Sequence, residues 1–230
     1  MDSILKRGGK VEYDGLATPA WLRWLLGESY FKEVVKVSLS RNADDDSLEC
    51  LKDLTRLQYL DLSESNISDA GLECLRRITT LQCLYLNDTK VSDTGLEALK
   101  DLRQLELLAL ANTNISDAGL RSPKSWTHLH IIELSDTKVG DAGLRSLSTL
   151  TQLQVIEICN TNVSDSGLAD LQGLSQLEQL GLDNTSISDA GLKQIKCLTK
   201  LETLSLSQTK VTDVGITDLQ RSLPNCKIEY

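Results

Sequence analysis

The sequence predicts an α/β fold, a right-handed solenoid bent into a horseshoe, with a parallel sheet on the concave face and short helices on the convex face. Leucines recur every 24 residues and each opens the pattern L-x-x-L-x-L, at Leu57, Leu81, Leu105, Leu129, Leu153, Leu177 and Leu201. A β-branched apolar residue stands at the eleventh position of every unit, and S-D-x-G-L or a close variant follows it. Self-similarity with a period of roughly 20 to 29 residues is typical of repeat solenoids in which each unit adds a strand and a helix.

The chain before the repeats divides into two predicted segments. Residues 1–17 lack a pattern that would anchor them, so we predict a flexible segment. Residues 18–34 open with Thr18 and Pro19, a combination favoured at helix N-termini, and Trp21 and Trp24 follow among apolar residues at helical spacing. Because a solenoid exposes its core where stacking stops, we predict a helical cap over the first unit. A separate docking helix is the alternative.

The repeat domain is predicted over residues 35–230, as one degenerate and seven full units with a C-terminal cap at 219–230. Val35, Val37 and Leu39 alternate like a strand and begin the degenerate unit. In each full unit the leucines at positions 1, 4 and 6 face inward, and strand alternation points positions 3, 5 and 7 to the opposite face. Each unit is therefore expected to contribute one short parallel strand.

Three further positions of the unit have predicted structural roles. Position 9 is Thr in six units and Ser65 in the first, which predicts hydroxyl groups that satisfy backbone groups of the turn. The Asp at position 13 starts each helix, so we interpret it as a helix cap rather than a metal ligand. The Gly at position 15 is predicted to let each helix lie close to the strands. The Asp residues are Asp69, Asp93, Asp117, Asp141, Asp165, Asp189 and Asp213.

One unit departs from the pattern. Pro123 stands in the middle of its helical segment, and Trp126 occupies a leucine position. Because proline removes a helical hydrogen bond and clashes with the preceding turn, we predict a shortened helix or an irregular turn. His128 and His130 flank this place without a nucleophile or acid to pair with, and we interpret them as isolated surface residues.

The units resemble leucine-rich repeats, closely over residues 57–230 and more loosely over 35–56. The form T-x-V-S-D-x-G-L-x-x-L-x-x-L, the opening W-L-R-x-L-L-G at 21–27 and the close L-P-N-C-K-I at 223–228 are similar to those of leucine-rich repeat proteins of planctomycete bacteria. Such proteins often carry an N-terminal membrane segment, so the resemblance implies a soluble relative or a trimmed fragment. The T-D-x-G-L element also resembles the cysteine-containing repeats beside F-boxes in ubiquitin-ligase receptors. Here the period is shorter, Thr replaces Cys and no F-box segment precedes the repeats.

Charge and composition restrict the partners. The net charge of -9 disfavours nucleic acid and anionic membranes, since both require a basic face. No apolar run is long enough to cross a bilayer, and the N-terminus lacks the apolar stretch of a signal peptide. We therefore expect a cytoplasmic protein, or the soluble part of a membrane-anchored one, that binds neutral or basic partners.

The six cysteines are predicted to be free thiols, typical of a reducing compartment. Cys50 and Cys74 occupy equivalent positions of neighbouring units, but neighbouring helix axes lie about 8 to 10 Å apart and a disulfide needs Cα atoms within about 7 Å. Cys197 and Cys226 are the one pair that could meet. No spacing of Cys and His suggests zinc.

The outward positions of the strands hold the candidate binding residues. Leu107, Ile131 and Val155 at position 3 are expected to form an exposed apolar ridge, flanked by tyrosines on one side and glutamates alongside. Apolar surface rimmed by charge is typical of partner sites, although Ile and Val also suit strands that bind nothing. The predicted partner-binding residues are Tyr59, Asp61, Cys83, Tyr85, Leu107, Ile131, Glu133, Val155 and Glu157.

These features favour a non-enzymatic protein-interaction module whose concave face binds a protein or peptide with apolar and basic groups. One alternative is a structural, self-associating spacer with Trp126 as the contact; another is a substrate-binding domain like that of ubiquitin-ligase receptors. An enzyme is disfavoured because the outward positions hold no catalytic grouping. Residues 44–46 (Asp-Asp-Asp) are a weak candidate for a calcium site. We predict no cofactor, no metal and no catalytic residue, and the oligomeric state stays open.

Overall fold

The computed structural model describes residues 10–13, 34–39, 41, 43–121 and 125–230. The predicted helical cap at 18–34 lies outside the described residues apart from Val34. Lys10–Tyr13 form a strand, β1, inside the segment for which flexibility is predicted. This strand was not predicted, because its antiparallel partner begins 24 residues later in the chain.

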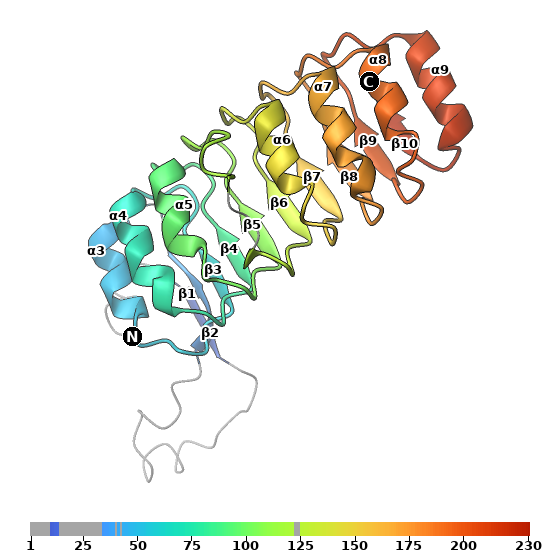
Figure 1. Ribbon diagram of the computed structural model, residues 1–230. Helices are drawn as coiled ribbons and strands as arrows, with labels where there is room; N and C mark the ends of the chain where they lie inside the picture. The colour runs from blue at the N-terminus through green and yellow to red at the C-terminus, as the bar shows by residue number, and fades with distance from the viewer. Residues whose placement is uncertain (1–9, 14–33, 40, 42, 122–124) are drawn as a thin grey trace.

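The strands form one open sheet whose order follows the sequence (Figure 1). β1 pairs antiparallel with β2, and all later neighbours are parallel. The predicted solenoid with one short parallel strand per unit is confirmed. The parallel strands are β2 (Val34–Ser38), β3 (Tyr59–Asp61), β4 (Cys83–Tyr85), β5 (Leu107–Ala109), β6 (Ile131–Glu133), β7 (Val155–Glu157), β8 (Gln179–Gly181), β9 (Thr203–Ser205) and β10 (Lys227–Glu229).

Short helices cover the opposite side of the sheet, as Figure 1 shows. Several end in a 3-10 turn, written η. They are α3 (Asp45–Leu48), η2 (Glu49–Leu51), α4 (Asp69–Leu72), η3 (Glu73–Arg77), α5 (Asp93–Leu99), α6 (Asp141–Leu147), α7 (Asp165–Leu168), η5 (Ala169–Gly173), α8 (Asp189–Leu192), η6 (Lys193–Ile195) and α9 (Asp213–Ser222). The helices stack in sequence order, so each unit contacts mainly its neighbours.

The core lies between the sheet and the helices and consists of the predicted inward positions. Leu81, Leu84 and Leu86 of the second unit are fully buried, as is the β-branched Val91 at position 11. The predicted role of position 9 is also confirmed, because each hydroxyl donates to the carbonyl three residues earlier at 2.5 to 2.7 Å. These bonds satisfy a carbonyl that turns inward as the chain leaves the strand.

Position 8 of every unit has a left-handed backbone, with φ between 52° and 58°. Asn and Asp tolerate this conformation better than other non-glycine residues, and they fill five of the seven positions. The left-handed residue turns the chain out of the strand at the same point in each unit. The residues are Glu64, Asp88, Asn112, Asp136, Asn160, Asn184 and Gln208.

The Asp at position 13 bonds to the next unit rather than capping its own helix. Asp165, for example, accepts from the backbone N–H of Ser188 at 2.8 Å and from its hydroxyl at 2.6 Å. The Ser at position 12 is the residue that caps its own helix, at α4, α5 and α8. The same inter-unit bonds join Asp45–Ser68, Asp69–Ser92, Asp93–Ser116, Asp141–Ser164 and Asp189–Thr212.

At Asp141 and Asp189 these bonds favour the ionised carboxylate. Burial alone would raise the pKa of Asp141, but the hydrogen bonds from Ser164 and Ser166 lower the pKa below its usual value. The backbone N–H and hydroxyl of Thr212 lower the pKa of Asp189 in the same way. Because these folded-state pKa values are lowered, the bonds contribute stability at neutral pH that is lost as the pH falls through them.

The glycines at position 15 make room for the same carboxylates. A Cβ on Gly191 would overlap the Oδ1 atom of Asp165 and lie 3.2 Å from the Cδ1 atom of Leu168, both in the preceding unit. The prediction that these glycines bring helices close to strands is therefore wrong, since the close approach is between units. The other glycines of this kind are Gly71, Gly95, Gly119, Gly167 and Gly215. A Cβ on Gly143 would meet both Val139 of its own unit, at 2.7 Å, and Asp117 of the preceding unit, at 2.8 Å.

The irregular unit between β5 and β6 has no α-helix in its described residues, as predicted, and residues 117–120 form turns. Trp126 is only 2% exposed, and its Nε1 donates to the carbonyl of Leu99 at 3.1 Å. The hypothesis that Trp126 is a self-association contact is therefore wrong, because its ring lies in the core.

Candidate functional site

The sheet face, defined by the outward positions 3, 5 and 7 of the strands, brings the predicted binding residues together. Leu107 aligns with Ile131, and Ile131 with Val155, so the apolar ridge is continuous across three strands. All three side chains are half-buried, whereas the sequence predicted an exposed ridge. Neighbouring outward side chains cover part of each one, which leaves a shallow apolar strip rather than a protruding ridge.

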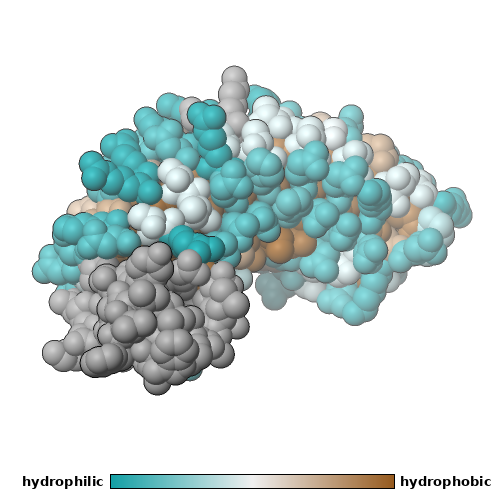
Figure 2. All heavy atoms as spheres, turned by 90° about the horizontal axis from the view of Figure 1, so that it is seen from below, coloured by the Kyte–Doolittle hydropathy of each residue, from teal (hydrophilic) through white to brown (hydrophobic). Residues whose placement is uncertain are grey.

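Seen from below, the molecular surface is mostly polar, with an apolar patch near the middle (Figure 2). In the part of the chain that the structure describes, the only large hydrophobic side chains that are exposed are Val214 and Tyr230. Both lie near the C-terminal end of the solenoid. The apolar side chains of the sheet face are half-buried and do not belong to this exposed group.

Aromatic rings occupy the N-terminal end of the sheet face. The ring centroids of Tyr59 and Tyr85 lie 5.2 Å apart with an interplanar angle of 43°. The Lys36 Nζ lies 4.5 Å from the centroid of the Tyr59 ring, a cation–π contact. Burial raises the pKa of Tyr85, with further contributions from Tyr59 and nearby acidic groups, so this phenol stays protonated and available as a donor.

Two glutamates lie alongside the apolar strip, on the strands of Ile131 and Val155, and they point away from each other. Glu133 accepts a hydrogen bond from Asn87 Nδ2 at 3.0 Å, two units towards the N-terminus. Glu157 leans towards the C-terminus, where a Cβ on Gly181 would overlap its Oε2 atom. Glu133 and Glu157 are register partners on adjacent strands, so mutual repulsion accounts for this divergence.

Glu157 carries a carboxylate that the protein only partly compensates. Burial raises the pKa of Glu157, and the negative charges of Glu133 and Asp183 raise it further, while a weak contact with Cys159 lowers it. A raised pKa means that the folded environment disfavours the ionised form. A cationic group from a partner placed here would relieve that cost.

We expect Glu157→Gln to raise the thermal unfolding temperature at pH 7. Because the folded-state pKa of Glu157 is raised, ionisation opposes folding increasingly as the pH rises from the ordinary value of 4.5 through the folded value. Thermal unfolding of both proteins between pH 3.5 and pH 8 checks this, and the difference should disappear at the acid end. A variant that is no more stable than the parent at pH 7 would contradict the assignment.

The cysteines of the sheet face are not activated nucleophiles. Burial raises the pKa of Cys83, as does the nearby Glu106, and burial is also the main cause of the raised pKa of Cys159. A thiol with a raised pKa is mostly un-ionised at neutral pH and reacts slowly. Cys197 and Cys226 are both free thiols, so the one suggested pair is not bridged; Cys74, Cys83 and Cys159 are free as well.

Other sequence candidates have structural roles or stay apart. Asp44 caps α3 in a capping box with Ser47, and Asp45 bonds to Ser68, which occupies two of the three carboxylates of the calcium candidate. His128 is exposed beside the carbonyl of Arg103, as expected for a surface residue. Among the described residues no group of three potential metal ligands occurs.

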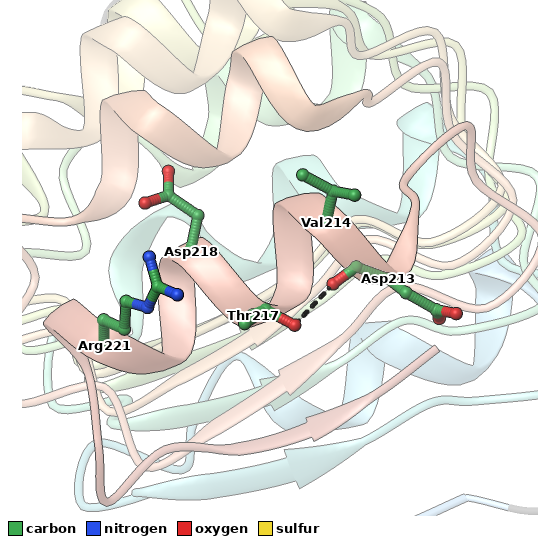
Figure 3. Close-up of a pocket in the computed structure, with 5 residues that line it drawn as sticks. All are labelled: Asp213, Val214, Thr217, Asp218 and Arg221. Carbon is green, nitrogen blue, oxygen red and sulfur yellow. Dashed lines mark hydrogen bonds between the residues drawn. The ribbon is translucent and has the colours of Figure 1, made fainter.

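A groove of about 410 Å³ lies on the last helix, away from the sheet face. Its five lining residues all come from α9, and the Thr217 hydroxyl donates to the carbonyl of Asp213 at 2.7 Å (Figure 3). The groove contains no catalytic grouping. It is lined by Asp213, Val214, Thr217, Asp218 and Arg221.

The structure adds residues to the sheet face that the sequence analysis missed. Lys36 belongs to the degenerate first unit, where no leucine pattern marks position 3, and its register with Tyr59 places it beside the aromatic pair. Asn87 and Asp183 stand at position 7 and could have been included by extending the same alternation. The space that Gly181 leaves for Glu157 could not be found without the direction of the Glu157 side chain.

Comparison with known proteins identifies similar chains. The family model described as "Leucine Rich repeat" matches residues 54–75, 77–100, 127–148 and 197–219. An internalin (inlF) of Listeria monocytogenes is 26% identical, with a TM-score of 0.61 over 82% of this chain and 57% of its own. Internalin C2 of the same species is 24% identical, with a TM-score of 0.70 over 86% of this chain and 81% of its own.

A third solved structure, a leucine-rich repeat protein of Leptospira interrogans, is 17% identical, with a TM-score of 0.61 over 79% of this chain and 45% of its own. This chain therefore spans little more than half of the inlF structure and less than half of the Leptospira one. No curated protein matches. In the described part of the chain, no helix has the length and apolar character needed to cross a bilayer.

Proposed function

Because this chain is a leucine-rich repeat protein, a family whose members commonly serve in protein–protein interaction, we propose that it is a non-enzymatic module that binds a protein or peptide on its sheet face. The observation that carries the proposal is the continuous strip of Leu107, Ile131 and Val155, with an aromatic pair at its N-terminal end and two glutamates alongside it. The inward and capping residues hold the units together, so the outward strand positions are free to bind.

The partner is proposed to carry apolar and basic groups. Apolar side chains would cover the strip, and hydroxyl or amide groups could bond to the protonated phenol of Tyr85. A Lys or Arg would lie beside Glu157, whose carboxylate is only partly compensated. The acidic net charge supports a protein partner over nucleic acid.

We expect Leu107→Asp combined with Ile131→Asp to weaken partner binding at least about a hundredfold, since buried apolar anchors at the centre of an interface each contribute about 1.4 kcal/mol or more. The measurement is the amount of partner captured from the native extract, followed by titration of that partner with purified protein. Both side chains are half-buried on the sheet face, so the variant must first show unchanged circular dichroism and cooperative unfolding.

Val214→Asp is the matched control, because it introduces the same residue at an apolar side chain that is 75% exposed and far from the sheet face. The control should bind as the parent does. Equal capture by all three proteins, each folded, would rule out the sheet face as the binding surface. Glu157→Gln should weaken the same complex and reduce its dependence on salt, which separates the basic contact from the apolar one.

A further inference from the structure

The strand β10 lies at the edge of the sheet and has β9 as its only strand neighbour among the described residues. The N–H of Lys227 donates to the carbonyl of Glu202 at 2.7 Å, and the carbonyl of Glu229 accepts from the N–H of Leu206 at 2.6 Å. Both residues thus direct their backbone groups towards β9. Since successive residues of a strand alternate, the N–H and C=O of the residue between them, Ile228, face the open edge.

The side chains of this strand carry opposite charges on either side of Ile228. Lys227 and Glu229 are exposed on the sheet face and form an ion pair at 2.5 Å. If two such strands pair antiparallel about Ile228, Lys227 of one chain lies opposite Glu229 of the other, and the reverse holds as well. Parallel pairing of the same two edges would instead turn the two sheet faces to opposite sides, so these charged side chains would not meet. The strand is therefore complementary to itself in one orientation only.

We propose that two copies of this chain associate tail to tail through β10, so that one sheet runs across a two-fold axis at Ile228. The two Ile228 residues exchange both of their outward backbone hydrogen bonds, as a hydrogen-bonded antiparallel pair does. Their half-buried side chains, which pack against the end of the core, cover each other. Such an interface is isologous and closes at the dimer.

Other features of the same end agree with a weak dimer of this kind. Charged side chains on an edge strand normally prevent pairing with unrelated strands, and the alternating signs here leave a second copy as the favoured partner. A three-residue strand alone buries too little for a stable interface. Val214, which is exposed, and the groove along α9 lie at the same end of the solenoid as β10.

The test uses two single charge reversals of the full chain, Lys227→Glu and Glu229→Lys. Each alone places like charges opposite each other, so its dimer dissociation constant should rise at least about tenfold. An equimolar mixture of the two variants restores opposite charges at both positions and should dimerise like the parent. Sedimentation velocity at low ionic strength over a range of concentrations measures each case. A merely structural role of the Lys227–Glu229 ion pair would not produce recovery on mixing.

Ile228→Pro provides a second, independent variant, because it removes the outward N–H while the bonds of Lys227 and Glu229 to β9 remain. It should be monomeric with an unchanged circular dichroism spectrum. A parent that stays monomeric at every concentration overturns the proposal, as does a mixture that does not recover the dimer. The double variant Leu107→Asp with Ile131→Asp should dimerise normally. The dimer and the proposed binding function are therefore tested independently of each other.

Discussion

Replacing Trp126 by alanine is expected to destabilise the protein by about 3–5 kcal/mol, as for other buried aromatic residues. The Trp126 ring is 2% exposed within the core, and its Nε1 is the donor to the Leu99 carbonyl of the preceding unit. Alanine would leave a cavity that the irregular turn cannot fill, together with a carbonyl that has lost this donor. Urea unfolding followed by far-ultraviolet circular dichroism measures the loss.

Two further variants separate the causes of that loss. Trp126→Phe keeps most of the apolar volume but cannot donate to Leu99, so it should cost about 1 kcal/mol. Tyr230→Ala removes an aromatic ring that is 62% exposed and should change stability little. If Trp126→Phe were as harmful as Trp126→Ala, the hydrogen bond rather than the packing would be the dominant contribution.

Trp126 also illustrates what the sequence could predict. The 24-residue period placed this residue at an inward position, and the proline predicted the loss of the helix, which is confirmed. The period therefore already implied burial, and the interpretation of Trp126 as a surface contact gave too much weight to the irregular helix beside it. A leucine position stays inward because the strands on either side, β5 and β6, remain in register.

The fold as a whole was predictable because each unit repeats the same inward positions, and stacking is the only way to bury them. The links between units were not predictable in the same way. Asp165 and Ser188 are 23 residues apart, and a Ser directly precedes most of these Asp residues, so the pattern suggested a cap within one helix. Only the distance between stacked helices shows that the bond runs to the next unit.

The sequence predicted which residues share the sheet face, but it did not predict the directions of their side chains. Strand alternation predicted that Glu133 and Glu157 lie on one face of the sheet, and the structure places them there. Their divergence depends on Asn87 and on the space above Gly181, which come from other units. The partial burial of the apolar strip likewise depends on the directions of neighbouring side chains. The 24-residue period does not predict these directions.

Replacing Gly191 by alanine is expected to cost about 1–3 kcal/mol, although alanine favours helices by about 1 kcal/mol over glycine. The new methyl group would overlap the carboxylate of Asp165, which is held in place by two bonds to Ser188. Gly173→Ala is the matched control, because nothing lies within 4 Å of a Cβ built at Gly173. It should leave the unfolding free energy unchanged or slightly raised.

A double-mutant cycle with Asp165→Ala tests whether the glycine serves the neighbouring unit. Asp165→Ala alone should cost about 1–3 kcal/mol, because it removes both bonds to Ser188. In that background Gly191→Ala should cost almost nothing, since the oxygen that the methyl group would overlap is gone and the Leu168 side chain can shift by a few tenths of an ångström. The two changes are therefore expected to be strongly non-additive in the unfolding free energy. Additive losses would instead indicate that Gly191 is needed for packing of α8 against its own strand, as the sequence alone suggested.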